Sequence, residues 1–164
     1  MQQREKVDSW EDAIKIASIP LLKEGIIEES YIENMIESVN KNGPYIVLMD
    51  YFALPHAKAG EGVNRLGMSL LTLNHPVDLK GNPVKVFLVL AAVDATSHIE
   101  ALADISELLM DPNNYEIFMS GDLEKIYEIL WVIFQSIISN GGKNLFLYLS
   151  KRYCITFHKY ITMI

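Results

Sequence analysis

Residues 84–100 read VKVFLVLAAVDATSHIE, and this stretch sets the architecture that the rest of the chain must fit. Residues 86–92 are apolar without a break, which is typical of a strand that is covered on both faces. A helix is expected next, because Ser97 and Glu100 have the spacing of a capping box and apolar residues follow at helical intervals. This helix would place His98 at its first position. A central strand followed by a helix predicts an α/β protein.

Two amphipathic helices are expected ahead of the strands. Ser9 and Asp12 have a spacing close to that of a capping box, and apolar residues at helical spacing follow as far as Gly25. Ser30 begins a second helix, which Asn-Gly-Pro at residues 42–44 ends. The acidic side chains of these helices would form a solvated face.

Three further extended segments are expected between the second helix and the central strand. Residues 45–49 predict a buried strand, and residues 51–55 predict an extended piece that leads to His56. Residues 66–73 predict another strand, followed by a turn-rich connection over residues 74–83. Because these strands have helices on both sides in the sequence, we expect a single-domain α/β sandwich.

The C-terminal part of the chain is expected to be helical. Helices are predicted over residues 112–119 and from 122 through 131–134, and Ser-Asn-Gly-Gly at 139–142 would end the second. Beyond this point apolar residues recur at three- and four-residue spacings to the end, which predicts a terminal amphipathic helix.

The last part of the chain differs in composition from the rest. No acidic residue follows Glu128, although the whole chain has a net charge of −7. We therefore expect residues 1–130 to form the domain and residues 131–164 to form an atypical extension. It would pack on the domain or on a partner in a homodimer, or it would be an altered C-terminus such as a frameshifted end.

Composition limits the classes of function. Half of the 164 residues are apolar, which suits one domain with a full core, and no apolar run approaches the roughly 20 residues of a membrane-spanning helix. The charged first residues predict no secretion signal. Cys154 is the only cysteine, which excludes an internal disulfide and favours a cytoplasmic location. The acidic balance argues against nucleic acid and favours protein or small-molecule partners.

His56 is the first candidate for chemistry. Pro55 fixes its own backbone and favours an extended Leu54, so His56 is expected at the rigid end of a strand. With an ordinary pKa of about 6.5, a neutral imidazole is a nucleophile that needs no activating base. The alternative is an ordinary loop histidine.

His98 is the second candidate, because in open α/β sheets ligands bind where strand ends meet helix starts. A helix start offers free N–H groups and a positive dipole end, which suit a phosphate on His56. The alternative is a solvent-facing helix residue. A zinc site using Asp94 or Glu100 is conceivable but lacks the spacing of known helical zinc motifs. His75 and His158 receive no role.

Several short motifs together carry a family resemblance. They are ALPHA at 53–57, DATSHIE at 94–100, NGPY at 42–45, EGV at 61–63, LGMSL at 66–70 and LAA at 90–92. Over roughly residues 10–130 the chain resembles the enzyme IIA component of the bacterial phosphoenolpyruvate-dependent sugar phosphotransferase system. The similarity lies in the mannitol/fructose superfamily and is greatest to its ascorbate-type branch.

The resemblance implies a phosphocarrier with a mixed β-sheet between helices and no metal or organic cofactor. His56 would accept a phosphoryl group from the phosphohistidine carrier protein and pass it to a cysteine of the cognate enzyme IIB. His98 would hydrogen-bond the phosphate and stabilise the charge that develops during transfer. The transported sugar would be ascorbate or a related pentose or hexitol, and contact with the membrane would be indirect, through the transporter.

The resemblance also implies a docking patch and exposes one departure. Leu54 and Ala57 are candidates for an apolar surface that contacts partner proteins. Mannitol-type members carry an arginine near the end of the helix before the first strand, where this chain has Asn-Lys-Asn at residues 40–42. Lys58 could supply that positive charge, so we expect Lys58 and Ser97 to bind phosphate.

Two other functions remain open at the level of sequence. A regulatory module of the same fold would sense phosphorylation without serving transport. A plain interaction domain would carry the two histidines by chance and would accept no phosphate.

Overall fold

The computed structural model describes the backbone of residues 1–139 and 146–147 and the side chains of residues 1–131. Its centre is an antiparallel pair of long strands, β4 (Gly67–Leu79) and β5 (Asn82–Ala91). The strand order is β1-β4-β5-β3-β2, in which β1 (Gln2–Arg4) runs parallel to β4 and β3 (Tyr51–Ala53) runs parallel to β5. The edge strand β2 (Val47–Met49) is antiparallel to β3, so the sheet is mixed.

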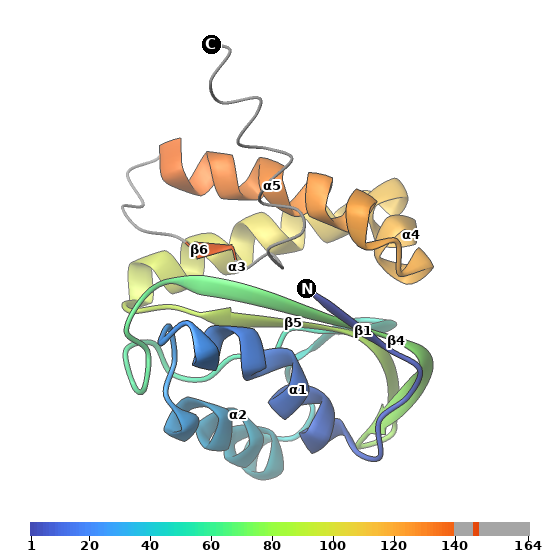
Figure 1. Cartoon of the computed structure of the whole chain (residues 1–164), viewed down its shortest axis with the longest axis horizontal. Coiled ribbons are helices and arrows are strands. Elements are labelled where there is room, and N and C mark those ends of the chain that lie inside the picture. Colours follow the sequence, from blue (N-terminus) through green and yellow to red (C-terminus); the bar gives the residue numbers. More distant parts are fainter. Residues whose placement is uncertain (140–145, 148–164) are drawn as a thin grey trace.

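Helices cover both faces of the sheet, as Figure 1 shows. On one face lie α1 (Trp10–Lys23) and α2 (Glu29–Asn42), and on the other lie α3 (Ala95–Met110), α4 (Pro112–Ser120) and α5 (Leu123–Ser139). The predicted α/β sandwich is therefore confirmed. The first helix begins as the sequence predicts, because the Ser9 hydroxyl accepts a hydrogen bond of 3.1 Å from the backbone N–H of Asp12.

Strand β5 explains why residues 86–92 are apolar without alternation. Phe87, Val89 and Ala91 pack toward α1 and α2, while Val86, Leu88 and Leu90 pack toward the other helix layer. Each successive side chain thus enters one of two cores, because side chains alternate across a strand. The prediction of a central strand with both faces covered is confirmed.

Two strand predictions are wrong. Residues 45–49 do not form a buried strand, because β2 lies at the edge of the sheet with Leu48 38% and Met49 37% exposed. Residues 74–83 are not a turn-rich connection either. Strand β4 continues to Leu79, and the turn is confined to Lys80 and Gly81, whose φ angles of 52° and 91° are those of a tight hairpin. The polar residues of this segment lie on the exposed part of the strand.

The second helix begins one residue earlier than predicted. Glu28 precedes it without a side-chain capping bond, and Ser30 lies inside its first turn.

The C-terminal segment is described in part. Phe146–Leu147 form β6, which pairs in parallel with β4, and therefore do not belong to the predicted terminal helix. The remainder of that predicted helix, residues 148–164, lies outside the described residues, and the division at residue 130 stays a prediction. Among the described residues, no helix has the length and apolar character needed to cross a membrane.

Candidate active site

The segment that carries His56 continues directly from β3. The backbone N–H of Leu54 donates to Ile46 O at 2.8 Å, and the N–H of Leu90 donates to Pro55 O at 3.0 Å. These bonds fix the two residues before His56 between the start of β2 and the end of β5. The expectation that His56 is rigidly mounted at a strand end therefore agrees with the backbone hydrogen bonds.

A buried tyrosine fixes the other side of His56. Tyr31, on the inner face of α2, donates its hydroxyl proton to Leu90 O at 2.7 Å and accepts from the N–H of Ala57 at 3.1 Å. Burial raises the pKa of Tyr31 to about 12, so the phenol stays protonated and keeps both bonds. Sequence reasoning missed this residue, since its only signal was a place on the apolar face of a helix.

The ring of His56 has one nitrogen occupied. Its Nδ1 lies 2.7 Å from the carbonyl oxygen of Leu54. Because a carbonyl oxygen can only accept, the neutral ring must hold its proton on Nδ1, which leaves the lone pair on Nε2. Burial lowers the pKa of His56, and the nearby His98 lowers it further, while the bond to Leu54 opposes both effects. His56 is therefore a neutral nucleophile with a defined reactive atom.

His98 reaches the same site because β3 and β5 are parallel neighbours. The chain leaves both strands at the same edge of the sheet, with His56 after β3 and His98 on α3 after β5. The two imidazole centroids lie 5.2 Å apart, with 53° between the ring planes. The structure thus brings the two candidate histidines together. Burial lowers the pKa of His98, so two neutral rings face each other.

The start of α3 corrects one prediction. Asp94, not Ser97, caps the helix, because the Asp94 carboxylate accepts from the N–H of Ser97 at 2.9 Å. An Asp three residues before a Ser competes with the capping box and wins here. His98 is consequently the fourth helical residue, not the first. Its Nδ1 is buried without a hydrogen-bond partner among the described residues, so the ring presents Nε2 to the pocket.

An open pocket of about 390 Å³ contains both histidines. Its lining comes from the end of α2, the segment before β2, the segment after β3 and the start of α3: Ser38, Asn42, Tyr45, His56, Ala57, Lys58 and His98. The pocket is large enough for a phosphoryl group with its surrounding water.

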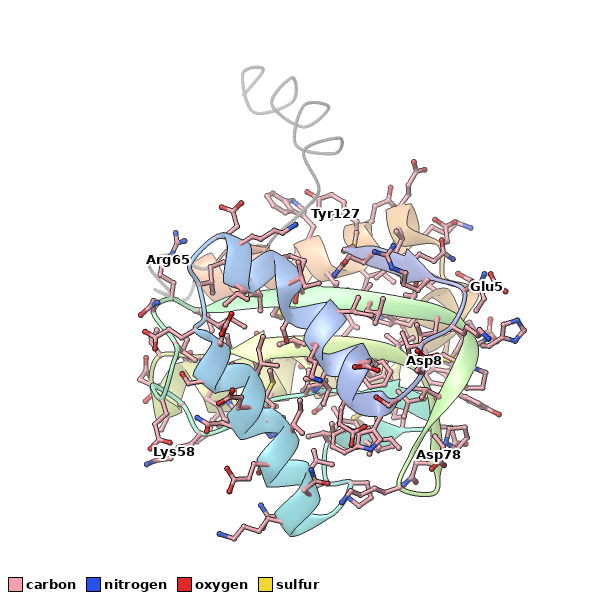
Figure 2. The ribbon with its side chains drawn as sticks, turned by 60° about the horizontal axis from the view of Figure 1, so that its bottom comes forward. Glu5, Asp8, Lys58, Arg65, Asp78 and Tyr127 are labelled. Carbon is pink, nitrogen blue, oxygen red and sulfur yellow. The ribbon has the colours of Figure 1, made fainter. Side chains whose placement is uncertain are left out.

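The predicted phosphate-binding residues are placed differently. Lys58 lines the pocket, but its exposed ammonium forms an ion pair with Glu61, which raises the pKa of Lys58. Figure 2 shows Lys58 extending from the surface beside α2. Ser97 does not line the pocket, and its hydroxyl donates to the Asp94 carboxylate at 2.9 Å.

The predicted docking residues also differ from each other. Ala57 lines the pocket, although only 8% of it is exposed. Leu54 is fully buried in the core that faces α3, so the prediction that it contacts partner proteins is wrong. Its apolar character serves the core beneath the site.

Three residues that line the pocket were not predicted from the sequence. The Tyr45 hydroxyl donates to His56 O at 2.9 Å, and its ring meets the His56 ring edge-on at a centroid distance of 5.3 Å. Ser38 and Asn42 lie one helical turn apart at the end of α2. The signal was present in that four-residue spacing, which puts both side chains on one face of the helix.

No group of three or more His, Cys, Asp or Glu side chains that could hold a metal ion occurs in the described part of the chain. The alternative zinc site therefore has no ligand set among those residues.

Comparison with known proteins identifies the family. A family model described as phosphoenolpyruvate-dependent sugar phosphotransferase system, EIIA 2, matches residues 1–131. The mannitol-specific cryptic phosphotransferase enzyme IIA component of Escherichia coli K12 is 38% identical over 118 residues, covering 71% of this chain and 80% of that protein. The ascorbate-specific PTS system EIIA component of Shigella boydii is 33% identical over 115 residues, covering 68% and 75%.

Solved structures agree. The solution structure of the Escherichia coli mannitol-specific cryptic phosphotransferase enzyme IIA has a TM-score of 0.73 and 33% identity, covering 79% of this chain and 90% of that one. A complex of Escherichia coli enzyme IIA-mannitol with phosphorylated enzyme IIB-mannitol shares the fold, with a TM-score of 0.65 and 22% identity over 76% of this chain and 89% of that one. The predicted resemblance is confirmed, and the chain belongs to the EIIA 2 family of the phosphoenolpyruvate-dependent sugar phosphotransferase system.

Proposed function

We propose that this protein is a phosphocarrier that accepts a phosphoryl group on His56 Nε2. The supporting observation is the hydrogen bond between His56 Nδ1 and Leu54 O, which leaves Nε2 as the free nitrogen beside His98 in an open pocket. The donor is the phosphohistidine carrier protein, and the acceptor is a cysteine of the cognate enzyme IIB. Membership of the EIIA 2 family supports this direction of transfer.

The reaction asks little covalent chemistry of the protein. The Nε2 lone pair of His56 attacks phosphorus, and a new P–N bond forms as the P–N bond to the donor histidine breaks and its electron pair returns to the donor ring. In the second step a cysteine thiolate attacks phosphorus, and His56 Nε2 regains its lone pair. Nδ1 keeps its proton throughout. His98 donates a hydrogen bond from Nε2 to the phosphoryl oxygens, so catalysis consists of positioning and charge stabilisation.

Partner proteins would dock on an apolar rim around the pocket. The Tyr45 ring lies against His56 and is 39% exposed. Val93, directly before the helix cap Asp94, is 40% exposed, and Ile99, directly after His98, is 65% exposed. They would provide the apolar contact surface that was predicted for Leu54. The solved enzyme IIA and IIB complex of the mannitol system supports an enzyme IIB as one such partner.

The sugar is assigned only by class. Relatives named for mannitol and ascorbate support a hexitol or ascorbate as the transported compound. The protein itself would contact only phosphoryl donors and acceptors. We place it in the cytoplasm, where it would meet the membrane only through the transporter.

The test is phosphorylation with phosphoenolpyruvate, enzyme I and the carrier protein. The wild type should acquire an acid-labile, base-stable phosphate, His56→Ala should acquire none, and His98→Ala should give a slower or less stable phosphoprotein. His75→Ala is the matched control, because His75 is an exposed histidine paired with Glu5.

Two outcomes would contradict the proposal. Loss of phosphate acceptance only in His98→Ala would reverse the two roles. A wild type that takes up phosphate but delivers none to any candidate enzyme IIB would indicate a regulatory module.

A further inference from the structure

The end of α2 forms one wall of the histidine pocket. Asn42, the last residue of the helix, donates its side-chain amide to Ser38 Oγ at 3.2 Å, and both residues line the pocket together with His56. Ser38 is half-buried and Asn42 is exposed, so both can reach a group that enters from solvent. The transfer steps proposed for His56 and His98 involve neither residue.

The hydrogen positions in this wall follow from what each atom can donate. The carbonyl of His56 can only accept, so the single hydroxyl proton of Tyr45 points at it across 2.9 Å. The Ser38 hydroxyl lies 3.0 Å from the Tyr45 oxygen and must then donate to it. An amide carries two N–H groups, and the contacts seen for Asn42 use one of them. The wall therefore has two hydrogen-bond donors for a ligand: the Ser38 hydroxyl, which can rotate, and the second N–H of the Asn42 amide, which is not used in these contacts.

The electrostatics of this wall explain why such donors are needed. A helix that ends at Asn42 points its carbonyl groups and the negative end of its dipole toward this side of the pocket. Lys58 is the cation among the described lining residues, and Glu61 already neutralises it. A doubly charged phosphoryl group would be repelled here unless neutral side chains donated hydrogen bonds to it.

We propose that Ser38 and Asn42 bind the phosphoryl oxygens of phosphorylated His56. On arrival of the phosphoryl group, the Ser38 hydroxyl turns from Tyr45 to a phosphoryl oxygen, and Asn42 donates its second N–H. The exchange is favourable because a neutral bond is replaced by one to an anion, which is roughly twice as strong. Tyr45 keeps its bond to the His56 carbonyl and acts as a positioning residue. This assignment rests on the proposed function of His56.

The experiment measures the rate of phosphate acceptance and the half-life of the phosphoprotein. We expect Ser38→Ala and Asn42→Ala each to lower the rate or shorten the half-life about 3- to 10-fold, since the pocket is open and water replaces part of each lost bond. The double variant should lose more than either single variant. Ser38→Thr keeps the hydroxyl and should restore at least part of the loss.

Matched controls separate this effect from general damage. Asn40→Ala removes an exposed amide from the same helix outside the pocket, and Ser106→Ala removes a helical serine hydroxyl that bonds only its own helix at Leu102 O. Both should behave as the wild type does, and thermal unfolding should show that all variants fold.

The possible results separate the two proposals. A wild type that accepts no phosphate would overturn the proposed function and this inference with it. A wild type that is phosphorylated normally, together with a folded double variant whose rate and half-life match those of the controls, would overturn the roles of Ser38 and Asn42 alone.

Discussion

One hydrogen bond decides the chemistry available to His56. The carbonyl of Leu54 holds the proton of the imidazole on Nδ1 and thereby directs the lone pair of Nε2 outward. Burial then favours the neutral ring, because a buried imidazolium loses hydration. Both effects act on the residue itself and require no base, so a single side chain can serve as acceptor and later as donor.

The pH dependence of phosphate acceptance follows from the lowered pKa of His56. A protonated ring has no lone pair on Nε2, so the initial rate should fall in acid with a midpoint below the ordinary value of about 6.5. His98→Asn removes a neighbouring imidazole whose protonated form disfavours protonation of His56, so it should move this midpoint upward by a small amount. NMR titration of His56 beside the rate profile checks both statements. A wild-type midpoint above the ordinary value would show that burial does not set the pKa of His56.

The start of α3 sets the place of the second histidine. With Asp94 as the cap, His98 lies more than half a turn further along the helix than the sequence predicted, and its ring reaches His56. The Ser97 hydroxyl supports the cap by donating to the Asp94 carboxylate. The capping residue therefore contributes to the site without touching it.

Removal of this cap should be measurable. Asp94→Ala should lower the melting temperature by about 2–4 °C, the shift expected when a chain of this size loses a typical capping bond. Ser97→Ala should have a smaller effect, because the N–H of Ser97 still finds the Asp94 carboxylate. Thermal unfolding followed by circular dichroism compares the two variants. A larger loss in Ser97→Ala would return the cap to the position predicted from the sequence.

The sequence predicts elements with strong periodic signals better than elements at edges and turns. Continuous apolar character identified β5, and capping with helical spacing identified α1. The polar residues of β4 led to the wrong prediction of a turn-rich connection, because an exposed strand segment and a turn have similar composition. Only the pairing with β5 distinguishes the two. The prediction that Leu54 contacts partner proteins failed because proximity to His56 in the sequence does not show on which face of the sheet a side chain packs.

The site residues also fall into two groups, those in recognisable motifs and those defined by tertiary contacts. His56 and His98 carry chemically rare side chains in recognisable motifs, and the sequence identified both. Tyr31 and Tyr45 act through bonds to other segments of the chain, at Leu90 O and His56 O. No local pattern marks such partners, because tertiary packing creates them.

The arrangement of the layers makes the site possible. The sheet order puts β3 beside β5 in parallel, so the two chain segments that leave these strands meet at one edge. The α1 and α2 layer supplies Tyr31 and the Ser38–Asn42 wall, and the α3 layer on the other face supplies His98 (Figure 1). The pocket therefore depends on the complete sandwich and not on one loop.

The phosphorylated nitrogen can be identified by long-range ¹H–¹⁵N and ³¹P NMR of the full chain, labelled with ¹⁵N-histidine and phosphorylated through enzyme I and the carrier protein. We predict phosphorus bonded to Nε2 of His56, with the proton retained on Nδ1. Phosphorus on Nδ1 of His56, or on either nitrogen of His98, would show that His56 Nε2 is not the acceptor atom.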